Sequence, residues 1–573
     1  MPLFSSDWPE MPLEEPTDTT FTEYFFKSVT RYADLVALID PDRRESVTFD
    51  ELRCRTGLVI RALSEIGVRK GHNIGTFVGN SIEYLVFFLA ANQIGAILVP
   101  LNPAYKLQEF EHYFTQAKAD WILTENEYAS KVRESQKLMD RISSLIVLPC
   151  RDDALLLKSF TNTKYLEDEP HPNPNTKNFI WQDSYTMSTD PAVIFFSSGT
   201  TGPPKGVVLS QRALCAHIAI ANHFRASSNL DDGDFVTLTN KDTVYGCLPF
   251  FHAGGLLTVF VMLAQGAKVM INRRFDEDVF IQNIDEYQVT VLNLVPPLLE
   301  FLAQSPKADP TLLTSLKYIY VGAAKVRPDL EDIISQKFPN VEQVLQLYGS
   351  TEAGVLVFMM PRKLKFDLLS PKVGSCGIPL PGVEPRILPS PSLETSSHFR
   401  FGELLLKTAT MMTSYIDGGN NAAESPFDKD GFLHTGDIVR LDSDGFFYIA
   451  GRTKELIKVR GWQVSPYELE EALKKRFASI LDIAVIGIPD EKLDEQPSAV
   501  IVLAPGRMLS GGEVEMYIED NFVSYKHLKG GVQFVDSLPR TPSGKLDRPA
   551  ILAMLTTESS TESEAETESE VKL

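Results

Sequence analysis

A run of hydroxyl and glycine residues closed by a lysine is the segment best suited to bind phosphate. It follows a hydrophobic stretch, Ala192 to Phe196, that predicts a strand, and it reads Ser197-Ser198-Gly199-Thr200-Thr201-Gly202-Pro203-Pro204-Lys205-Gly206. Glycines let backbone amides approach phosphate oxygens, hydroxyls donate further hydrogen bonds, and lysine adds a positive charge. The spacing is not that of a Walker P-loop. Composition alone leaves a phosphate loop and a turn between strands equally open.

A second segment carries the residue types that bind a magnesium nucleotide. It reads Gln346-Leu347-Tyr348-Gly349-Ser350-Thr351-Glu352. From Tyr348 to Glu352 an aromatic face, a hydroxyl and a hard oxygen ligand fall within five residues. These are suited to a base, a phosphate and Mg²⁺, respectively. In isolation the same residues are typical of a turn that leads into a helix.

These two segments resemble motifs of the adenylate-forming superfamily, which contains acyl-CoA synthetases, adenylation domains and luciferases. The phosphate loop matches almost residue for residue, and the other motifs of that superfamily follow in order. The resemblance is to the branch of plant 4-coumarate:CoA ligases and firefly luciferase, and it covers nearly the whole chain. It implies an ATP-dependent acid:CoA ligase that converts a carboxylic acid into its acyl-adenylate and transfers the acyl group to CoA.

The resemblance also assigns roles within the nucleotide site. It implies that Tyr348 stacks on adenine, that Thr351 meets the α-phosphate and that Glu352 holds Mg²⁺. It further implies that Asp437, in His434-Thr435-Gly436-Asp437, accepts hydrogen bonds from the ribose, with Arg452 nearby. Alone, Thr-Gly-Asp is typical of a β-turn. The ATP and AMP residues implied are Ser197, Ser198, Gly199, Thr200, Thr201, Gly202, Lys205, Gln346, Leu347, Tyr348, Gly349, Thr351, Asp437, Arg452, Lys454, Gln463 and Lys545.

Two C-terminal motifs match parts of the superfamily that move during the reaction. The segment from Lys454 to Pro466 resembles the hinge and first strand of a mobile domain, with a pivot near Lys454. It implies that Lys458 and Gln463 serve the second step.

The same resemblance places Arg460 and Gly461 along the tunnel for the CoA thiol. The segment from Leu538 to Arg548 matches the superfamily's C-terminal lysine motif. A lysine on a Gly/Pro loop can enter a site and retract, and Lys545 would offset negative charge during attack on the α-phosphate.

The acyl side is marked by two weaker segments. Leu248 to Gly255 resembles the segment whose histidine, here His252, gates the carboxylate pocket, although a lone histidine in an apolar run is often a core residue. Val321-Gly322-Ala323-Ala324 looks like the pocket wall of the ligases and luciferases. Leu347 also lines this pocket by resemblance. Two positions depart from the pattern: Lys325 replaces a usual proline, and Leu347 replaces a glycine. Both departures bear on which acid the enzyme accepts and leave the expected reaction unchanged.

The pattern of the chain predicts an α/β fold of several layers. A capping box at Thr48 and Glu51 predicts a helix whose apolar stripe is Leu52, Leu58, Val59, Ala62, Leu63 and Ile66. Strand and helix patterns then alternate, which indicates parallel β-α units. We expect a large N-terminal domain of stacked sheets and helices over residues 1–453, a small mobile α/β lid over 454–555, and an acidic disordered tail over 556–573.

Composition excludes some classes of partner. The chain has 573 residues and a net charge of −21, which argues against nucleic acid or an anionic membrane surface as a partner. Five scattered cysteines without a C-x-x-C pair indicate reduced thiols. No signal peptide is evident at the N-terminus, and the apolar stretch from Tyr84 to Leu101 predicts a buried helix and strand rather than a membrane span.

Several alternatives stay open from the sequence. A luciferase-like oxygenase and an adenylation enzyme that loads a carrier protein share this site. A non-catalytic binding protein is disfavoured because Lys545, Lys458, Glu352, Asp437 and the phosphate loop are all retained. The sequence does not identify the acid, since medium-chain fatty acids, hydroxycinnamates and other aryl acids all fit the branch. It also leaves the oligomeric state open.

The C-terminal tripeptide bears on localisation. Val571-Lys572-Leu573 resembles the Ser-Lys-Leu address read by the peroxisomal import receptor, but a valine replaces the small first residue. The protein is therefore expected to be cytoplasmic or, if this weak signal is read, peroxisomal.

Overall fold

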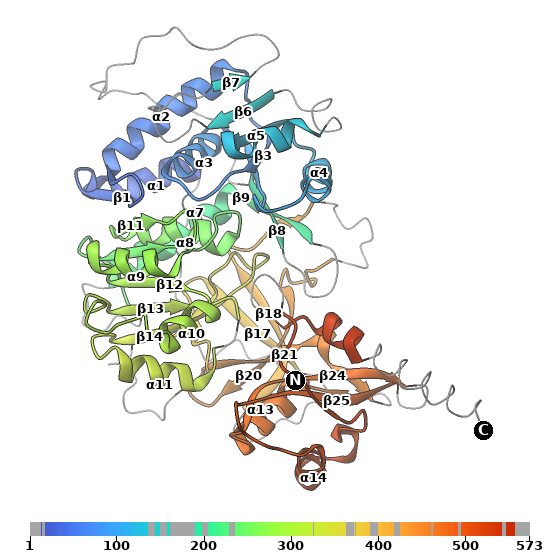
Figure 1. The fold of residues 1–573 in the computed structure, drawn as a ribbon. Coiled ribbons are helices and arrows are strands. Elements are labelled where there is room, and N and C mark those ends of the chain that lie inside the picture. The colour runs from blue at the N-terminus through green and yellow to red at the C-terminus, as the bar shows by residue number, and fades with distance from the viewer. Residues whose placement is uncertain are drawn as a thin grey trace. The chain divides into compact units, whose positions relative to one another are not determined.

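The computed structural model describes residues 13, 16, 18–135, 144–148, 158–160, 189–197, 204–227, 235–324, 326–362, 372, 374–389, 399–416, 425–459, 462–490, 494–540 and 546–555. Contacts within the chain divide it into two compact units. The N-terminal unit holds the described residues of Trp8–Glu384 and Leu406–Leu433. The C-terminal unit holds Pro385–Leu405 and the described residues from His434 onward. Both units mix helices with β-sheet, as the alternating pattern predicted (Figure 1).

The first sheet of the N-terminal unit has eight strands in the order β19-β9-β8-β4-β3-β5-β6-β7. At its centre β3 (Asn73–Phe77) pairs in parallel with β4 (Ile97–Pro100) and with β5 (Trp121–Glu125). The predicted parallel β-α units are therefore confirmed here, because parallel neighbours need a crossover that a helix supplies. The other strands are β6 (Ser144–Leu148), β7 (Lys158–Phe160), β8 (Pro191–Ser197), β9 (Lys205–Ser210) and β19 (Ser414–Tyr415).

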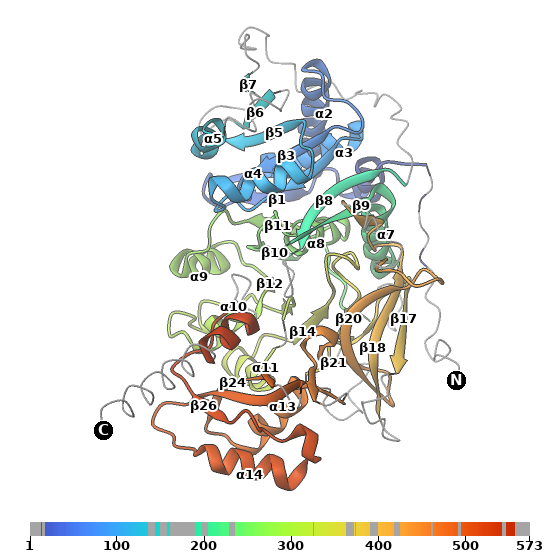
Figure 2. The ribbon, with the colours of Figure 1, turned by 90° about the vertical axis from the view of Figure 1, so that its right-hand side faces the viewer.

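Helices cover both faces of this sheet, and local signals start them. The capping box of Thr48 and Glu51 opens α2 (Phe49–Glu65), and Ser81 caps α3 (Ile82–Ile94). Figure 2 shows α4 (Leu107–Gln116) and α5 (Asn126–Arg133) on the side of the sheet opposite α3. Apolar side chains of α4 and α5 pack into one core with the sheet. The stretch from Tyr84 to Leu101 is thus a buried helix and a strand, as predicted.

The predicted apolar stripe of α2 was wrong at one position. Leu52, Val59 and Leu63 are buried, but Leu58 is 38% exposed. Neighbouring helical residues point about 100° apart. Leu58 therefore falls on the flank of the face that Val59 buries.

The second sheet of the N-terminal unit has nine strands in the order β16-β15-β14-β13-β12-β10-β11-β1-β2. The strands from β14 to β1 are parallel, and the edge strands are antiparallel. The parallel strands are β1 (Val36–Asp40), β10 (Thr243–Gly246), β11 (Lys268–Ile271), β12 (Val291–Leu294), β13 (Tyr318–Val321) and β14 (Gln343–Tyr348). The edges are β2 (Glu45–Thr48), β15 (Phe358–Met359) and β16 (Ile378–Pro379).

Six more helices and a large apolar core complete the described N-terminal unit. The core joins the second sheet to α9, α10 and α11. The helices are α1 (Phe21–Val29), α7 (Gln211–Ser227), α8 (Ala253–Ala264), α9 (Glu277–Glu286), α10 (Pro296–Gln304) and α11 (Pro328–Lys337), of which α1 packs on α7 and α3. No helix in the described part of the chain is long and apolar enough to cross a membrane.

The C-terminal unit contains two further sheets. One has the order β17-β18-β20-β21, and the other has the order β23-β22-β25-β24 with β26 beside β25. The strands of the first are β17 (Val383–Pro389), β18 (Phe399–Thr408), β20 (Leu433–Asp442) and β21 (Phe447–Arg452). Those of the second are β22 (Ile457–Val459), β23 (Trp462–Val464), β24 (Ile480–Asp490), β25 (Asp494–Leu503) and β26 (Val532–Phe534). A pivot at Lys454 stays a prediction.

Helices also pack on the second of these sheets. α13 (Pro466–Arg476) contacts β24, and α14 (Gly511–Asn521) contacts β26. α14 begins at Gly511 because Ser510 and Glu513 form a capping box.

Some predictions fall on residues outside the described part. They include Lys325, residues 198–203 and 541–545, and the tail 556–573. Of the cysteines, Cys54, Cys215, Cys247 and Cys376 are free thiols, whereas Cys150 is not among the described residues.

Candidate active site

The phosphate loop connects two antiparallel strands. β8 and β9 pair so that Ser197 lies directly opposite Lys205. The Ser197 hydroxyl donates to the carbonyl of Lys205 over 3.4 Å, at the base of the loop. The residues between them that the sequence singled out, Ser198 to Gly202, lie outside the described part. The hairpin therefore holds the two described ends of the loop side by side.

Lys205 lies beside a residue that the sequence did not single out. Its ammonium nitrogen is 4.8 Å from the centre of the Tyr415 ring, close enough for a cation–π contact. The Tyr415 hydroxyl donates to Oε1 of Glu352 over 3.4 Å. Burial, with a further contribution from the Glu352 carboxylate, raises the pKa of Tyr415, so its hydroxyl keeps its proton. One tyrosine thus contacts two candidate site residues from different motifs.

The adenine segment begins on an interior strand and continues as a tight loop. Tyr348 ends β14, and its ring stacks on the buried Phe358 ring with centres 5.4 Å apart. Phe358 covers one side of the tyrosine, which steadies the ring that adenine would meet. Gly349 is required by close packing, since a Cβ there would lie 1.6 Å from the carbonyl oxygen of Val355. Val355 itself has φ +80, a strained value for a β-branched residue.

The side chain of Gln346 has a structural partner. Its amide donates to Glu331 on α11, and its backbone carbonyl accepts from Met360 over 3.1 Å. Burial raises the pKa of Glu331, while the bond from Gln346 lowers it. A buried amide needs such a partner. Nucleotide contact by Gln346 therefore stays a prediction, and the described contacts explain its burial without one.

The candidate ribose site lies in the C-terminal unit. Asp437 on β20 and Arg452 on β21 are directly opposite in the antiparallel register, and Arg452 Nε lies 2.9 Å from an Asp437 oxygen. Asp437 is only 4% exposed, so this pairing offsets the cost of burying its charge. The Thr435 hydroxyl accepts from the Asp437 amide and donates to the carbonyl of Leu404. The two residues that the resemblance assigned to ribose are thus neighbours.

His252 is exposed at the start of α8, so the alternative of a core histidine is wrong. The loop before it is held by Asn80, which the sequence did not single out. Asn80 donates to the carbonyl of Leu248 over 3.0 Å and accepts from the amide of Phe250 over 2.8 Å. An amide side chain that bonds both ways fixes the loop that presents His252. The gating role itself stays a prediction.

The predicted pocket wall brings Gly322 next to Leu347. β13 and β14 are parallel with Val321 opposite Gln346, so the following residues are also adjacent. A Cβ on Gly322 would lie 3.3 Å from Cβ of Leu347. Ala323 is exposed and adopts φ +70, and Ala324 follows it. The two strand ends thus present one continuous surface on which Leu347 is the largest side chain of the set.

The residues predicted for the second step share a hairpin. β22 and β23 are antiparallel, with Lys458 opposite Gln463, and Lys458 is exposed. Arg460 and Gly461 form the connection and lie outside the described residues. Lys454, also exposed, belongs to the short 3₁₀ helix Thr453–Glu455 that precedes β22. The local fold therefore groups these residues within one short segment.

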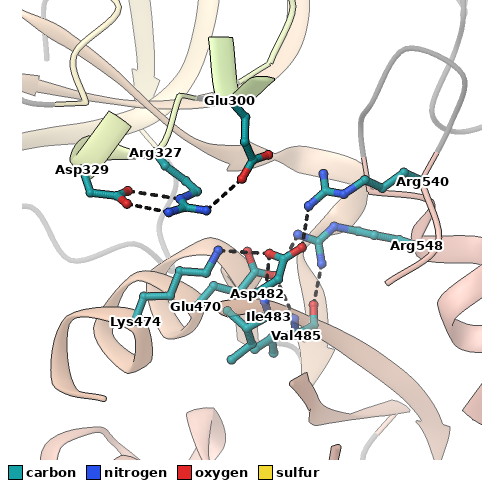
Figure 3. A network of polar contacts seen from close by, with 10 residues as sticks. All are labelled: Glu300, Arg327, Asp329, Glu470, Lys474, Asp482, Ile483, Val485, Arg540 and Arg548. Atoms are coloured by element: carbon teal, nitrogen blue, oxygen red, sulfur yellow. Dashed lines mark hydrogen bonds and ion pairs between the residues drawn. The ribbon is translucent and has the colours of Figure 1, made fainter. Parts of the chain in front are cut away.

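The loop that carries Lys545 has a well-defined base. Arg540 and Leu546 form an antiparallel bridge, and the Asp547 amide donates to the carbonyl of Pro539 over 3.0 Å. Lys545 itself lies outside the described residues. Arg540 pairs with Asp482 on β24, which also accepts from Lys474 on α13 (Figure 3).

Arg548 anchors the other end of this loop. It donates to Glu470 over 2.9 Å and to the carbonyl of Val485 over 2.6 Å (Figure 3). Its Nε also lies 3.3 Å from a carboxylate oxygen of Glu455. Burial lowers the pKa of Arg548, but Glu470 and Glu455 raise it further, so the net shift is upward. Glu455 follows the predicted pivot directly. Arg548, whose side chain is 19% exposed, therefore joins the segment after Lys545 to the segment after Lys454.

Replacing Arg548 by alanine is expected to lower the free energy of unfolding by about 3–5 kcal/mol, because two carboxylates lose their buried partner. Urea unfolding of the full chain measures the loss. Arg327→Ala is the control, since Arg327 pairs with the more exposed Glu300 and Asp329 (Figure 3) and should cost no more than about 1 kcal/mol. Equal losses in the two variants would contradict the anchoring role.

The donor set fits a magnesium ion held jointly with a nucleotide. Glu352 supplies one hard carboxylate beside a hydroxyl residue, Thr351. Within the described residues no group of three or more His, Cys, Asp or Glu side chains could form a metal site made by the protein alone. Mg²⁺ is commonly bound by one or two carboxylates together with substrate phosphates and water. Glu352 would therefore hold the ion only when phosphates complete its shell.

The described residues thus combine an α/β fold with the residue types predicted to bind a nucleotide, and the fold itself indicates the class of protein. The chain belongs to the AMP-binding enzyme family: the AMP-binding enzyme domain matches residues 25–416, and the AMP-binding enzyme C-terminal domain matches residues 468–545. The predicted resemblance to the adenylate-forming superfamily is confirmed.

Relatives named for two different activities align over almost the entire chain. 4-coumarate--CoA ligase 5 of Oryza sativa subsp. japonica is 31% identical over 557 residues, which cover 96% of this chain and 97% of the relative. Luciferin 4-monooxygenase of Photinus pyralis is 29% identical over 551 residues, covering 96% of each. The predicted branch is therefore confirmed as well.

Solved structures show the same fold. ATP-bound MatB from Rhodopseudomonas palustris superposes with a TM-score of 0.75 at 23% identity, covering 94% of this chain and 99% of that protein. The anthranilate CoA ligase AuaEII, in complex with anthranoyl-AMP, gives a TM-score of 0.73 at 21% identity, with 94% and 98% covered. At these identities the likeness establishes the fold alone.

Proposed function

We propose that this enzyme activates a carboxylic acid with ATP and then transfers the acyl group to the thiol of CoA. The observation that carries the proposal is the contact of Lys205 and Glu352 with one tyrosine, Tyr415. It brings a phosphate-binding cation and a magnesium-binding carboxylate to one place from two separate motifs. Alignment with acid:CoA ligases over nearly the whole chain supports the thiol acceptor.

In the first step a carboxylate oxygen attacks the α-phosphorus of ATP, and pyrophosphate leaves. Tyr348 would stack on adenine, Asp437 would accept from the ribose hydroxyls, and Lys205 would bind phosphate oxygens. Lys545 would offset the negative charge that builds during attack. Bound Mg²⁺, held by Glu352, would neutralise charge on the phosphates. His252 would sit at the entrance of the carboxylate pocket.

In the second step the CoA thiolate attacks the acyl carbonyl, and AMP leaves. Adenylation prepares this step because AMP is a far better leaving group than a carboxylate oxygen. Lys454 would act as pivot, Lys545 would withdraw, and Lys458 with Gln463 would approach the acyl-adenylate. Arg460 and Gly461 would line the path of the thiol. One site would thus perform two reactions through a conformational step.

The acid is proposed to be apolar and of moderate size, either a medium-chain fatty acid or an aryl acid such as a hydroxycinnamate. The pocket wall of Gly322, Ala323 and Ala324 offers no charged side chain to a substrate tail. Leu347 fills space where the relatives named in the resemblance have glycine, which favours a slim acyl group. A fatty acid would place the enzyme in fatty acid metabolism.

Pyrophosphate release, measured with a panel of carboxylic acids in the presence and absence of CoA, tests the proposal. Acid-dependent release that yields an acyl-CoA supports it. Release without thioester formation, in the presence of CoA, would favour a carrier-loading enzyme. Light emission or oxygen consumption with an aryl acid would favour the luciferase-like alternative, which the alignment with luciferin 4-monooxygenase keeps open.

Leu347→Gly is expected to shift preference toward bulkier or longer acids by about tenfold, since one removed side chain changes discrimination by roughly 1–3 kcal/mol. The measurement is the ratio of kcat/KM values across a chain-length and aryl series. Leu312→Ala is the control, because Leu312 is exposed, whereas Leu345 beside Leu347 is fully buried and its loss would destabilise the fold. An unchanged profile in Leu347→Gly would show that Leu347 does not line the pocket.

A further inference from the structure

Residues 412–416 lie between the phosphate hairpin and the Glu352 loop. The amides of Thr413 and Ile416 donate to the carbonyls of Val208 and Gly206 on β9, over 2.9 and 2.8 Å. The amide of Met412 donates to the carbonyl of Glu352 over 2.8 Å. The backbone of this short segment therefore bonds both motifs, and the Thr413 hydroxyl adds a bond to the carbonyl of Val208 over 3.2 Å.

The side chain of Ile416 packs directly on Gly206 of the facing strand. A Cβ on Gly206 would lie 2.1 Å from Cδ1 of Ile416, so a larger residue there would require that side chain to move. Tyr415 pairs with Val207, so its position along β9 is set by the same register. The side chain of Tyr415 is consequently presented from a fixed backbone.

Tyr415 touches two opposite charges at different parts of its side chain. The ring face receives the Lys205 ammonium at 4.8 Å, and the hydroxyl donates to Glu352 at 3.4 Å. Among the described residues, no ion pair joins Lys205 to Glu352. Such a pair would neutralise both groups before a nucleotide could use them. The neutral tyrosine interacts only weakly with each charged group, through a cation–π contact with Lys205 and a hydrogen bond to Glu352. Both groups can therefore exchange these interactions for contacts with a nucleotide.

We propose that Tyr415 is a positioning residue for ATP binding: it keeps the Lys205 cation and the Glu352 carboxylate apart and aims both at the phosphates and their magnesium ion. The proposal rests on the proposed function in so far as ATP is the nucleotide. It makes a specific prediction, because the ring and the hydroxyl serve different partners. Removing the hydroxyl lowers the affinity that depends on magnesium, which Glu352 would hold. Removing the ring also lowers the affinity for the phosphates themselves, which Lys205 would bind.

Calorimetric titration of ATP into the full-length enzyme, with and without Mg²⁺, separates the magnesium-dependent affinity for ATP from the metal-free affinity. Tyr415→Phe keeps the ring and is expected to weaken binding of magnesium ATP by about three- to tenfold, the range of one hydrogen bond, while binding of metal-free ATP is unchanged. Tyr415→Leu is expected to weaken metal-free ATP by a similar factor, the range of one cation–π contact. These readouts need no acid and no CoA, so they are independent of whether thioester is formed.

A matched control exists in the C-terminal unit. Tyr448 also has a cation over its ring, Arg440 at 4.1 Å, and a carboxylate at its hydroxyl, Asp442 at 3.1 Å. Tyr448→Phe should leave both ATP affinities unchanged. The proposal is overturned if Tyr415→Phe binds magnesium ATP as the wild type does, or if it loses affinity equally with and without Mg²⁺. A melting curve for each variant identifies unfolding, and Tyr415→Phe decides the question if Tyr415→Leu fails to fold.

Discussion

Replacing Lys545 by alanine is expected to lower acid-dependent ATP–pyrophosphate exchange by about 100- to 1000-fold, the range for one charged group aimed at a transition state. Thioester formation from supplied acyl-AMP and CoA should fall by no more than about threefold, because the lysine would have left the site by then. The bridge between Arg540 and Leu546 is made by backbone atoms of those two residues, so the variant is expected to keep it and to fold normally.

Both half-reactions must be measured on the same preparation. Lys529→Ala, at an exposed lysine of the C-terminal unit, is the control and should behave as the wild type in both assays. Equal losses in the two half-reactions, or no loss in either, would show that Lys545 does not serve the first step specifically.

Gly349→Ala is expected to lower kcat/KM for ATP by about 10- to 100-fold. The added Cβ would lie 1.6 Å from the backbone oxygen of Val355, and backbone cannot rotate away as a flexible side chain can. Forcing an extra methyl group into tight packing costs roughly 1–3 kcal/mol, and here the displaced loop joins Tyr348 to Glu352. Melting curves and steady-state kinetics with varied ATP measure the effect.

Gly512→Ala provides the matched control for Gly349→Ala. Gly512 lies in α14, and a Cβ there would meet nothing within 4 Å. Alanine should stabilise that helix by about 0.5–1 kcal/mol and leave kcat/KM for ATP unchanged. Wild-type kinetics in Gly349→Ala would mean that the loop accepts a methyl group and does not position the nucleotide.

Local features of the fold could be predicted because short-range chemistry controls them. The capping box of Thr48 and Glu51 starts α2 where the sequence placed it, and Ser81 starts α3. The same kind of signal at Ser510 and Glu513 starts α14. Such hydrogen bonds join residues three apart, so their effect can be read without knowing the tertiary structure.

The candidate site was only partly predictable, because the contacts within it join residues that are far apart in the sequence. Asp437 and Arg452 were both singled out, but their pairing depends on the register of β20 and β21. Gln346 was assigned to the nucleotide, whereas its side chain bonds Glu331 on α11, a helix that packs beside its strand. A buried polar group takes the partner that the fold brings to it, and spacing along the chain does not reveal that partner.

By itself, the sequence determined the family and the class of enzyme, because the chemistry of nucleotide binding requires particular residue types in short motifs. The residues that would carry the reaction stay predictions. Only the tertiary structure decided which of those residues share partners. Tyr415 belongs to no motif that the sequence singled out, and it reaches Lys205 and Glu352 because β19 pairs with β9 across a long separation in sequence. Register between distant strands is set by packing and backbone hydrogen bonds over the whole sheet, and a short motif contains neither.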